Sequence, residues 1–186
     1  MHKKRLLLHT CCAPCASYVI ELLKPEYDIT LFFYNPNIEP EDEYIKRKNE
    51  LNNLLQIVNS SKETPQIGLL ENEYDNSAFT AAVLSYQNQP EGGERCTECY
   101  KIRLYETAKR AKAEEYDIFT STLSVSPHKN AKLLNEFGQN AANEYVIDYL
   151  EADFKKKDGY LHSIKLTKKY NLYRQTYCGC SFSKPT

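Results

Sequence analysis

The alternation of short apolar runs with longer helical patterns constrains the fold of this chain most strongly. Four apolar runs have the β-branched, leucine-rich or aromatic composition of strands, and they lie at residues 5–9, 28–34, 66–70 and 117–122. Helical patterns lie between and after them, at residues 14–23, 40–58, 76–85, 96–115, 130–145 and 159–170. Because strands that alternate with helices pair in parallel, we predict an α/β, Rossmann-like three-layer domain with a mainly parallel sheet.

The length of 186 residues suits a single domain that buries its own core. We predict one domain over residues 1–186, with an α/β core at 1–150 and a small, basic helical extension at 151–186. Gly138, inside a helical pattern, predicts a bend there. No apolar run reaches the roughly 20 residues of a membrane helix, and Leu6–Leu8 is too short for a secretory signal. We therefore expect a cytoplasmic protein without a membrane partner.

Seven cysteines form three groups, with the patterns C-C-x2-C, C-x2-C and C-x-C. The groups comprise Cys11, Cys12 and Cys15; Cys96 and Cys99; and Cys178 and Cys180. A reducing cytoplasm disfavours structural disulfides, so clustered cysteines indicate metal or redox chemistry. Two C-x2-C pairs supply four thiolates, which is enough for a zinc site or an iron–sulfur cluster. The three remaining thiols favour a second metal or a redox-active thiol set.

The two C-x2-C pairs lie at predicted helix starts. There the helix dipole is expected to lower the pKa of Cys12 and Cys15 and to favour the thiolate, which is the form that binds metal. Gly179 permits a tight turn through which Cys178 and Cys180 can direct both sulfurs to one centre.

The loops after the first, second and fourth predicted strands are expected to share one rim, because ligands of open parallel sheets bind beyond the carboxyl ends of the strands. These loops lie at residues 11–15, 35–38 and 124–130. His9, at the end of the first strand, is expected to be a buried, hydrogen-bonded histidine.

Positive charge is concentrated near the C-terminus. The chain has a formal net charge of −1, yet residues 155–174 hold seven basic residues and one acid, Asp158. The basic residues are Lys155, Lys156, Lys157, Lys165, Lys168, Lys169 and Arg174. The segment therefore carries +6 and the rest of the chain −7, which makes the segment a candidate surface for anions.

Six motifs follow one another through nearly the whole chain. They are H-T-C-C-A-P-C at His9–Cys15, F-F-Y-N-P-N-I at Phe32–Ile38, R-C-x2-C-Y-x2-R at Arg95–Arg103, S-P-H-K-N at Ser126–Asn130, D-F-K-K-x-D-G-Y at Asp153–Tyr160 and Y-R-Q-x-Y-C-G-C at Tyr173–Cys180. In this combination the sequence resembles the QueH family, the cobalamin-independent epoxyqueuosine reductases.

The resemblance implies reduction of epoxyqueuosine to queuosine at the wobble position of tRNA, the last step of queuosine biosynthesis. It implies a [4Fe–4S] cluster, an adjacent mononuclear iron and an external low-potential electron donor. By similarity, the cluster is held by Cys12, Cys15, Cys96 and Cys99, and the other iron is held by a second set of cysteines. That second set is Cys11, Cys178 and Cys180. Spacing leaves this pairing open. An open-site iron suits the chemistry, because loss of the epoxide oxygen as water needs two electrons, two protons and a Lewis acid.

Each of the further candidate residues has two alternative roles. Asn35 and Asn37 are substrate contacts or turn formers, and His128 and Lys129 either bind a tRNA phosphate or base near a helix start or form a solvated loop. Tyr177, beside the metal cysteines, is a candidate proton donor or a packing residue. The basic segment is expected to hold the tRNA backbone, through Lys156, Lys165, Lys169 and Arg174.

Two rival functions make different demands on the sequence. An ATP-dependent tRNA-modifying enzyme of the pyrophosphatase-loop type needs a glycine- and serine-rich loop after the first strand, and residues 10–15 contain no glycine. A zinc-stabilised tRNA-binding protein without redox chemistry suits the basic segment, although its metal site leaves three cysteines unexplained.

Overall fold

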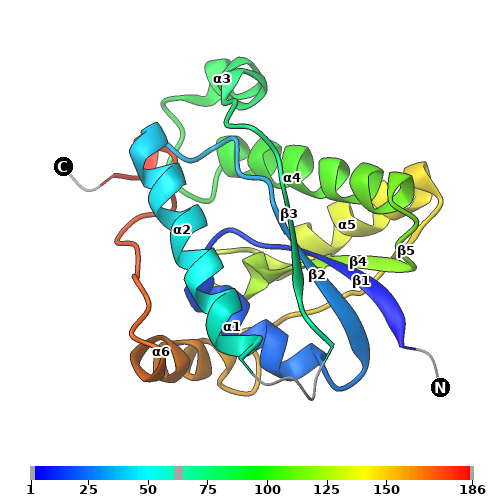
Figure 1. Cartoon of the computed structure of the whole chain (residues 1–186). Coiled ribbons are helices and arrows are strands. Elements are labelled where there is room, and N and C mark those ends of the chain that lie inside the picture. Colours follow the sequence, from blue (N-terminus) through cyan, green and yellow to red (C-terminus); the bar gives the residue numbers. More distant parts are fainter. Residues whose placement is uncertain (1–2, 61–64, 185–186) are drawn as a thin grey trace.

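A five-stranded, all-parallel sheet forms the centre of the computed structural model, which describes residues 3–60 and 65–184 (Figure 1). The strand order is β3-β2-β1-β4-β5. The strands are β1 (Lys4–His9), β2 (Tyr27–Phe33), β3 (Gly68–Glu71), β4 (Ile118–Ser121) and β5 (Asp148–Tyr149). This arrangement confirms the predicted α/β, Rossmann-like class.

Helices cover both faces of the sheet and complete the three layers (Figure 1). On one face lie α1 (Ala13–Leu23), α2 (Glu41–Val58) and α6 (Gly159–Lys169), and on the other lie α4 (Glu94–Ala113) and α5 (Ala131–Tyr145). The short helix α3 (Ser77–Val83) packs against α4. Single 3-10 turns occupy Leu84–Tyr86, Thr122–Val125 and Ser181–Ser183. Within the described residues, no helix has both the length and the hydropathy that a membrane span requires.

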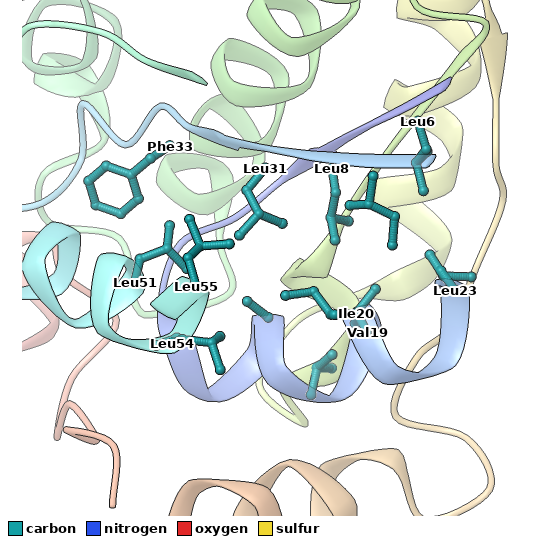
Figure 2. Packing of buried hydrophobic residues seen from close by; sticks show 14 of the residues in the cluster. Leu6, Leu8, Val19, Ile20, Leu23, Leu31, Phe33, Leu51, Leu54 and Leu55 are labelled. Atoms are coloured by element: carbon teal, nitrogen blue, oxygen red, sulfur yellow. The ribbon is translucent and has the colours of Figure 1, made fainter. Parts of the chain in front are cut away.

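Alternation along the buried strands divides the core into two halves. Leu6 and Leu8 of β1 face α1 and α2, as Figure 2 shows, whereas Leu7 packs with residues of α4 and α5. All three side chains are fully buried. Each such burial contributes about 1.5–3 kcal/mol, and residues on both faces of a parallel strand are expected to be apolar.

Two details of the helices were not predicted from the sequence. Helix α4 begins at Glu94 rather than at Cys96, so Cys96 and Cys99 lie just inside its first turns. Helix α5 continues through Gly138 without interruption, and the sequence did not indicate why a glycine lies there. The glycine is needed for packing, because a Cβ atom there would lie 2.2 Å from Cζ of Tyr149.

We expect Gly138→Ala to lower the free energy of unfolding by about 1–3 kcal/mol, because the added methyl group overpacks the Tyr149 ring. At an unobstructed helix position the same change would stabilise the protein by roughly 1 kcal/mol. Urea unfolding of the variant beside Gln139→Ala, an exposed neighbour on α5, measures the difference. A Gly138→Ala protein as stable as the wild type would contradict this explanation.

Candidate metal and redox site

Three loops meet at the carboxyl edge of the sheet, as the sequence predicted. They follow β2, β1 and β4, which are neighbours in the sheet. The amide nitrogen of Asn35, after β2, donates to the carbonyl of Thr10, after β1, over 2.9 Å. Lys129, after β4, extends its ammonium group to the sulfur of Cys178 from the C-terminal segment, over 3.0 Å. The fold therefore gathers cysteines from three distant parts of the chain at one edge.

The first three cysteines form a compact group, here called the N-terminal sulfur group. The sulfurs of Cys11, Cys12 and Cys15 all lie within 4.8 Å of one another, an arrangement that a metal ion can bridge. Pro14 in the first turn of α1 starts the helix directly beneath them. All seven cysteines of the chain are free thiols.

The ionisation of this group differs from the sequence-based expectation. Hydrogen bonds from the thiols of Cys12 and Cys15 lower the pKa of Cys11 well below its ordinary value. The interaction with Cys11 raises the pKa of Cys12 to about 12, and it also raises the pKa of Cys15. The expected lowering at Cys12 and Cys15 is wrong for the metal-free protein, because three adjacent thiols cannot all carry charge and Cys11 ionises first.

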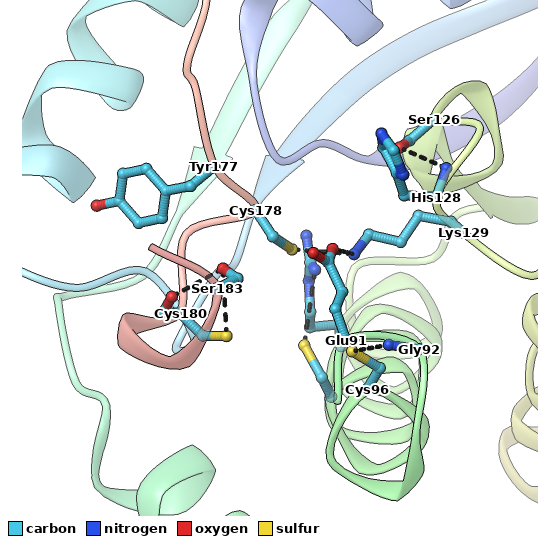
Figure 3. Close-up of polar contacts among 12 residues, drawn as sticks. Glu91, Gly92, Cys96, Ser126, His128, Lys129, Tyr177, Cys178, Cys180 and Ser183 are labelled. Carbon is cyan, nitrogen blue, oxygen red and sulfur yellow. Dashed lines mark hydrogen bonds and ion pairs between the residues drawn. The ribbon is translucent and has the colours of Figure 1, made fainter. Parts of the chain in front are cut away.

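The remaining four cysteines line one narrow cavity and are called the cavity sulfur group. In Figure 3 the sulfurs of Cys96, Cys178 and Cys180 point toward a shared space. The cavity is lined by Asn37, Phe79, Arg95, Cys96, Cys99, Tyr100, Arg103, Lys129, Cys178 and Cys180. The backbone N–H of Gly92 donates to the sulfur of Cys96 over 3.2 Å. Burial raises the pKa of Cys99 to about 11.

The cavity is lined by three buried cations, Arg95, Arg103 and Lys129, and the last two contact sulfurs. Arg103 is 1% exposed, and its guanidinium donates to Asn35 over 2.7 Å and approaches the Cys99 sulfur at 3.8 Å. Burial alone would lower the pKa of Lys129, but Cys178, Tyr100 and Cys96 together outweigh burial and raise it. Arg103 and Lys129 therefore stay charged and stabilise negative charge on the neighbouring sulfurs.

Comparison with known proteins decides the family. The family profile described as Epoxyqueuosine reductase QueH matches residues 6–186. The chain belongs to this family. Its members are oxidoreductases, and the resemblance seen in the six motifs is confirmed.

Curated relatives carry the same description over nearly the whole chain. A protein of Staphylococcus epidermidis named epoxyqueuosine reductase QueH is 42% identical over 183 residues, which cover 97% of this chain and 76% of that protein. The Staphylococcus aureus protein of that name is 39% identical, with the same coverage. The protein of that name from Thermotoga maritima is 33% identical over 178 residues, which cover 96% of this chain and 89% of that protein.

The donor set fits the metal centres that the family resemblance implies. Thiolates are the ligands of iron–sulfur clusters and also bind zinc. The N-terminal and cavity sulfur groups offer seven of them, and the buried Arg103 and Lys129 offset the negative charge that such centres bring. Arg103 forms no ion pair with a carboxylate of the described residues, and a buried cation of this kind is expected beside an anionic group.

The other sequence-derived candidates divide by burial. Asn35 and Asn37 are both 1% exposed, and within the described residues the Oδ1 atom of Asn37 has no hydrogen-bond partner. His128 is exposed at the rim. Tyr177 points away from the cysteines in Figure 3, and its hydroxyl donates to the carbonyl of Glu39 over 2.6 Å. That contact favours a packing role for Tyr177 rather than proton donation.

The basic residues proposed for tRNA lie in the open. Lys156, Lys165, Lys169 and Arg174 are exposed. Arg174 contacts the hydroxyl of Tyr160. Sequence reasoning gave no role to Arg103 or to Arg47 of α2, although both are 1% exposed. Arg103 is the last residue of the motif at Arg95–Arg103. For Arg47, the only sequence feature that could suggest a role is an acid four residues before it.

His9 is buried, as expected, and its ring predicts an acid sensitivity. Burial, and then the charge of Arg103, lower the pKa of His9 from 6.5 to about 3. The unfolded chain therefore binds a proton that the folded chain excludes, so stability is complete above pH 6.5 and falls between 6.5 and about 3. We expect His9 to contribute a loss of about 1.4 kcal/mol per pH unit in that range. Urea unfolding at several pH values should show a shallower slope for His9→Gln, and equal slopes would contradict this.

Proposed function

We propose that this chain reduces epoxyqueuosine to queuosine at the wobble position of tRNA. Family membership supports the proposal, since the relatives bear the name of this activity. The structural observation that carries it is the gathering of seven free thiols and the buried cations Arg103 and Lys129 at the carboxyl edge of the sheet. Neither a phosphate-binding loop nor a simple four-cysteine zinc site accounts for this arrangement.

We further propose a [4Fe–4S] cluster and an adjacent mononuclear iron as cofactors. An external low-potential donor would supply their electrons. Cys12, Cys15, Cys96 and Cys99 are the proposed cluster ligands, and the proposed ligands of the second iron are Cys11, Cys178 and Cys180. The positions of the cysteines in the fold favour another division of the ligands, in which the N-terminal sulfur group holds one metal centre and the cavity sulfur group holds the other. Experiments must therefore distinguish the two divisions. When bound, these centres would supply single electrons and a Lewis acid.

The residues around the cysteines have separate tasks in this proposal. Removal of an epoxide oxygen as water consumes two electrons and two protons. Arg103 and Lys129 place positive charge beside the sulfurs of Cys99 and Cys178, which would offset the negative charge of a bound metal centre. Asn35 fixes the guanidinium of Arg103 through its Oδ1 atom. The Oδ1 atom of Asn37 is buried at the cavity wall and has no hydrogen-bond partner in the described part of the chain, which suits a hydrogen bond from the modified base. The base must leave the anticodon stack, which costs little in a single-stranded loop.

The activity is tested with tRNA that carries epoxyqueuosine. Protein reconstituted anaerobically with iron and sulfide is incubated with this tRNA and a strong chemical reductant, and the nucleosides are analysed by mass spectrometry. We expect a nucleoside that has lost one oxygen atom, and tRNA with unmodified guanine should stay unchanged as the control. Epoxyqueuosine recovered intact from fully reconstituted protein would refute the proposal.

We expect the triple variant Lys156→Ala, Lys165→Ala, Lys169→Ala to bind tRNA more weakly and with a flatter salt dependence. These exposed lysines would release counterions from the tRNA backbone, so their loss should reduce the slope of log affinity against log salt by about 2–3. The matched control replaces Lys4, Lys109 and Lys112, which are exposed near the opposite edge of the sheet. An unchanged slope in the first variant would place the tRNA elsewhere.

A further inference from the structure

The segment that carries Cys178 and Cys180 has no regular structure of its own. Residues 170–180 follow α6 and form neither helix nor strand. In Figure 1 this segment runs alongside α2 toward the C-terminus. Buried backbone groups of such a segment need partners from other elements, and these partners decide where the two thiols lie.

Arg47 of α2 supplies two of these partners. Its Nη1 atom donates to the carbonyl of Cys178 over 3.0 Å, and its Nη2 atom donates to the carbonyl of Tyr177 over 3.1 Å. Its Nε atom donates to Glu43 over 2.7 Å, and the Arg47 side chain is 1% exposed. A guanidinium can make three such bonds in fixed directions, whereas a lysine ammonium has no planar fork.

Further contacts connect the same stretch of α2 and the preceding loop to the segment. Glu43 accepts a hydrogen bond from the hydroxyl of Tyr173 over 3.1 Å, and Glu50 accepts one from the backbone N–H of Tyr173 over 2.9 Å. The N–H of Glu39 donates to the carbonyl of Gly179 over 2.9 Å. The segment is therefore held along its length by α2 and the turn before it.

Gly179 allows the closest approach. Its φ angle is +128°, and a Cβ atom there would lie 2.9 Å from Cγ1 of Ile38 and 3.2 Å from Nη1 of Arg47. From the opposite side, Lys129 reaches the sulfur of Cys178. The Cys178-Gly179-Cys180 turn is thus fixed between Arg47 and Lys129.

We propose that Arg47, oriented by Glu43, is a positioning residue that docks the Cys178-Gly179-Cys180 turn against the cysteines of α4. Arg47 acts on the backbone of the turn, through the carbonyls of Tyr177 and Cys178. The inference rests on the proposed function only for the role that it gives to the two thiols. Its test uses metal-free protein, so an absence of reductase activity would leave the outcome readable.

The test is thiol labelling of the whole chain under reducing, metal-free conditions. The double variant Glu43→Gln, Arg47→Met keeps the volume of both side chains and leaves no unpaired buried charge. Alkylation rates at Cys178 and Cys180 are measured by peptide mass spectrometry, with Cys12 of the N-terminal sulfur group as the internal reference. Lys48→Ala, on the same helix but paired with Glu71 of β3, is the matched control.

We expect alkylation of Cys178 and Cys180 to be about tenfold faster in the double variant, because the turn opens locally while the fold persists. Cys12 and the thermal midpoint should change little, and Lys48→Ala should label like the wild type. Arg47→Lys, which keeps the charge but not the fork, should resemble the double variant. Unchanged rates at Cys178 and Cys180, an equal rise at Cys12, or wild-type labelling in Arg47→Lys would each overturn the proposal.

Discussion

Serine in place of Cys96 or Cys99 is expected to reduce turnover at least about a hundredfold, because each change removes a proposed cluster ligand. A hydroxyl is a poor ligand for an iron–sulfur cluster, so the variants should also lose acid-labile sulfide and visible absorption after anaerobic reconstitution. Iron, sulfide and absorption spectra measured beside the turnover number provide the test. Both side chains are buried within α4, and a thermal unfolding curve of the metal-free variants controls for misfolding.

The tail cysteines give the contrasting result. Cys178→Ser or Cys180→Ser should abolish turnover to a similar extent while leaving the cluster spectrum largely intact, because these thiols are assigned to the second iron. All four cysteines of the cavity sulfur group line the same cavity, so the opposite result is physically reasonable. If the tail variants lose the cluster as readily as the α4 variants, then the ligands divide by proximity and the proposed assignment is wrong.

Arg103→Met is expected to weaken retention of the metal centres by about 10–100-fold, the usual effect of removing a group that supports metal ligands. The guanidinium is buried beside Cys99 and is close enough to Cys11 and Cys178 for their charges to raise its pKa. Methionine fills similar space but leaves the ionised thiols without this compensating charge. The measurement is the rate at which a chelator removes iron from the reconstituted protein.

A matched variant separates the charge of Arg103 from general damage to α4. Arg110→Met lies on the same helix, and its side chain is partly exposed and paired with Glu114. Such a surface pair contributes up to about 1 kcal/mol and should not affect iron retention. Equal iron loss from Arg103→Met and from the wild type would mean that the buried charge plays no part in holding the metal.

Much of the fold could be predicted because its signals are local. Strands β1 and β2 contain the apolar runs Leu6–Leu8 and Leu31–Phe33, and the helical patterns that follow each strand are long enough to recognise. Strand β5 was missed because two residues are too few to show a pattern. The need for glycine at position 138 could not be predicted, because the ring that excludes a side chain there is that of Tyr149 in the unrecognised strand β5.

The candidate site could be predicted only as far as its cysteines. Spacing identified the three groups but left their pairing open. The family resemblance paired Cys12 and Cys15 with the cysteines of α4, whereas the folded chain places the tail cysteines in the α4 cavity. The role of Arg47 was invisible because it looks like an ordinary basic residue with an acid at i−4. Only the path of the C-terminal segment across α2 reveals what its guanidinium binds.

The metal dependence of the reductase activity tests most directly whether the cysteines hold redox-active iron rather than a structural metal. The chain is purified metal-free and loaded anaerobically either with iron and sulfide or with zinc, and the conversion of epoxyqueuosine in tRNA is measured for both. We expect conversion only in the iron form, with stoichiometric acid-labile sulfide and more iron than sulfide. Full conversion by the zinc form would contradict the account.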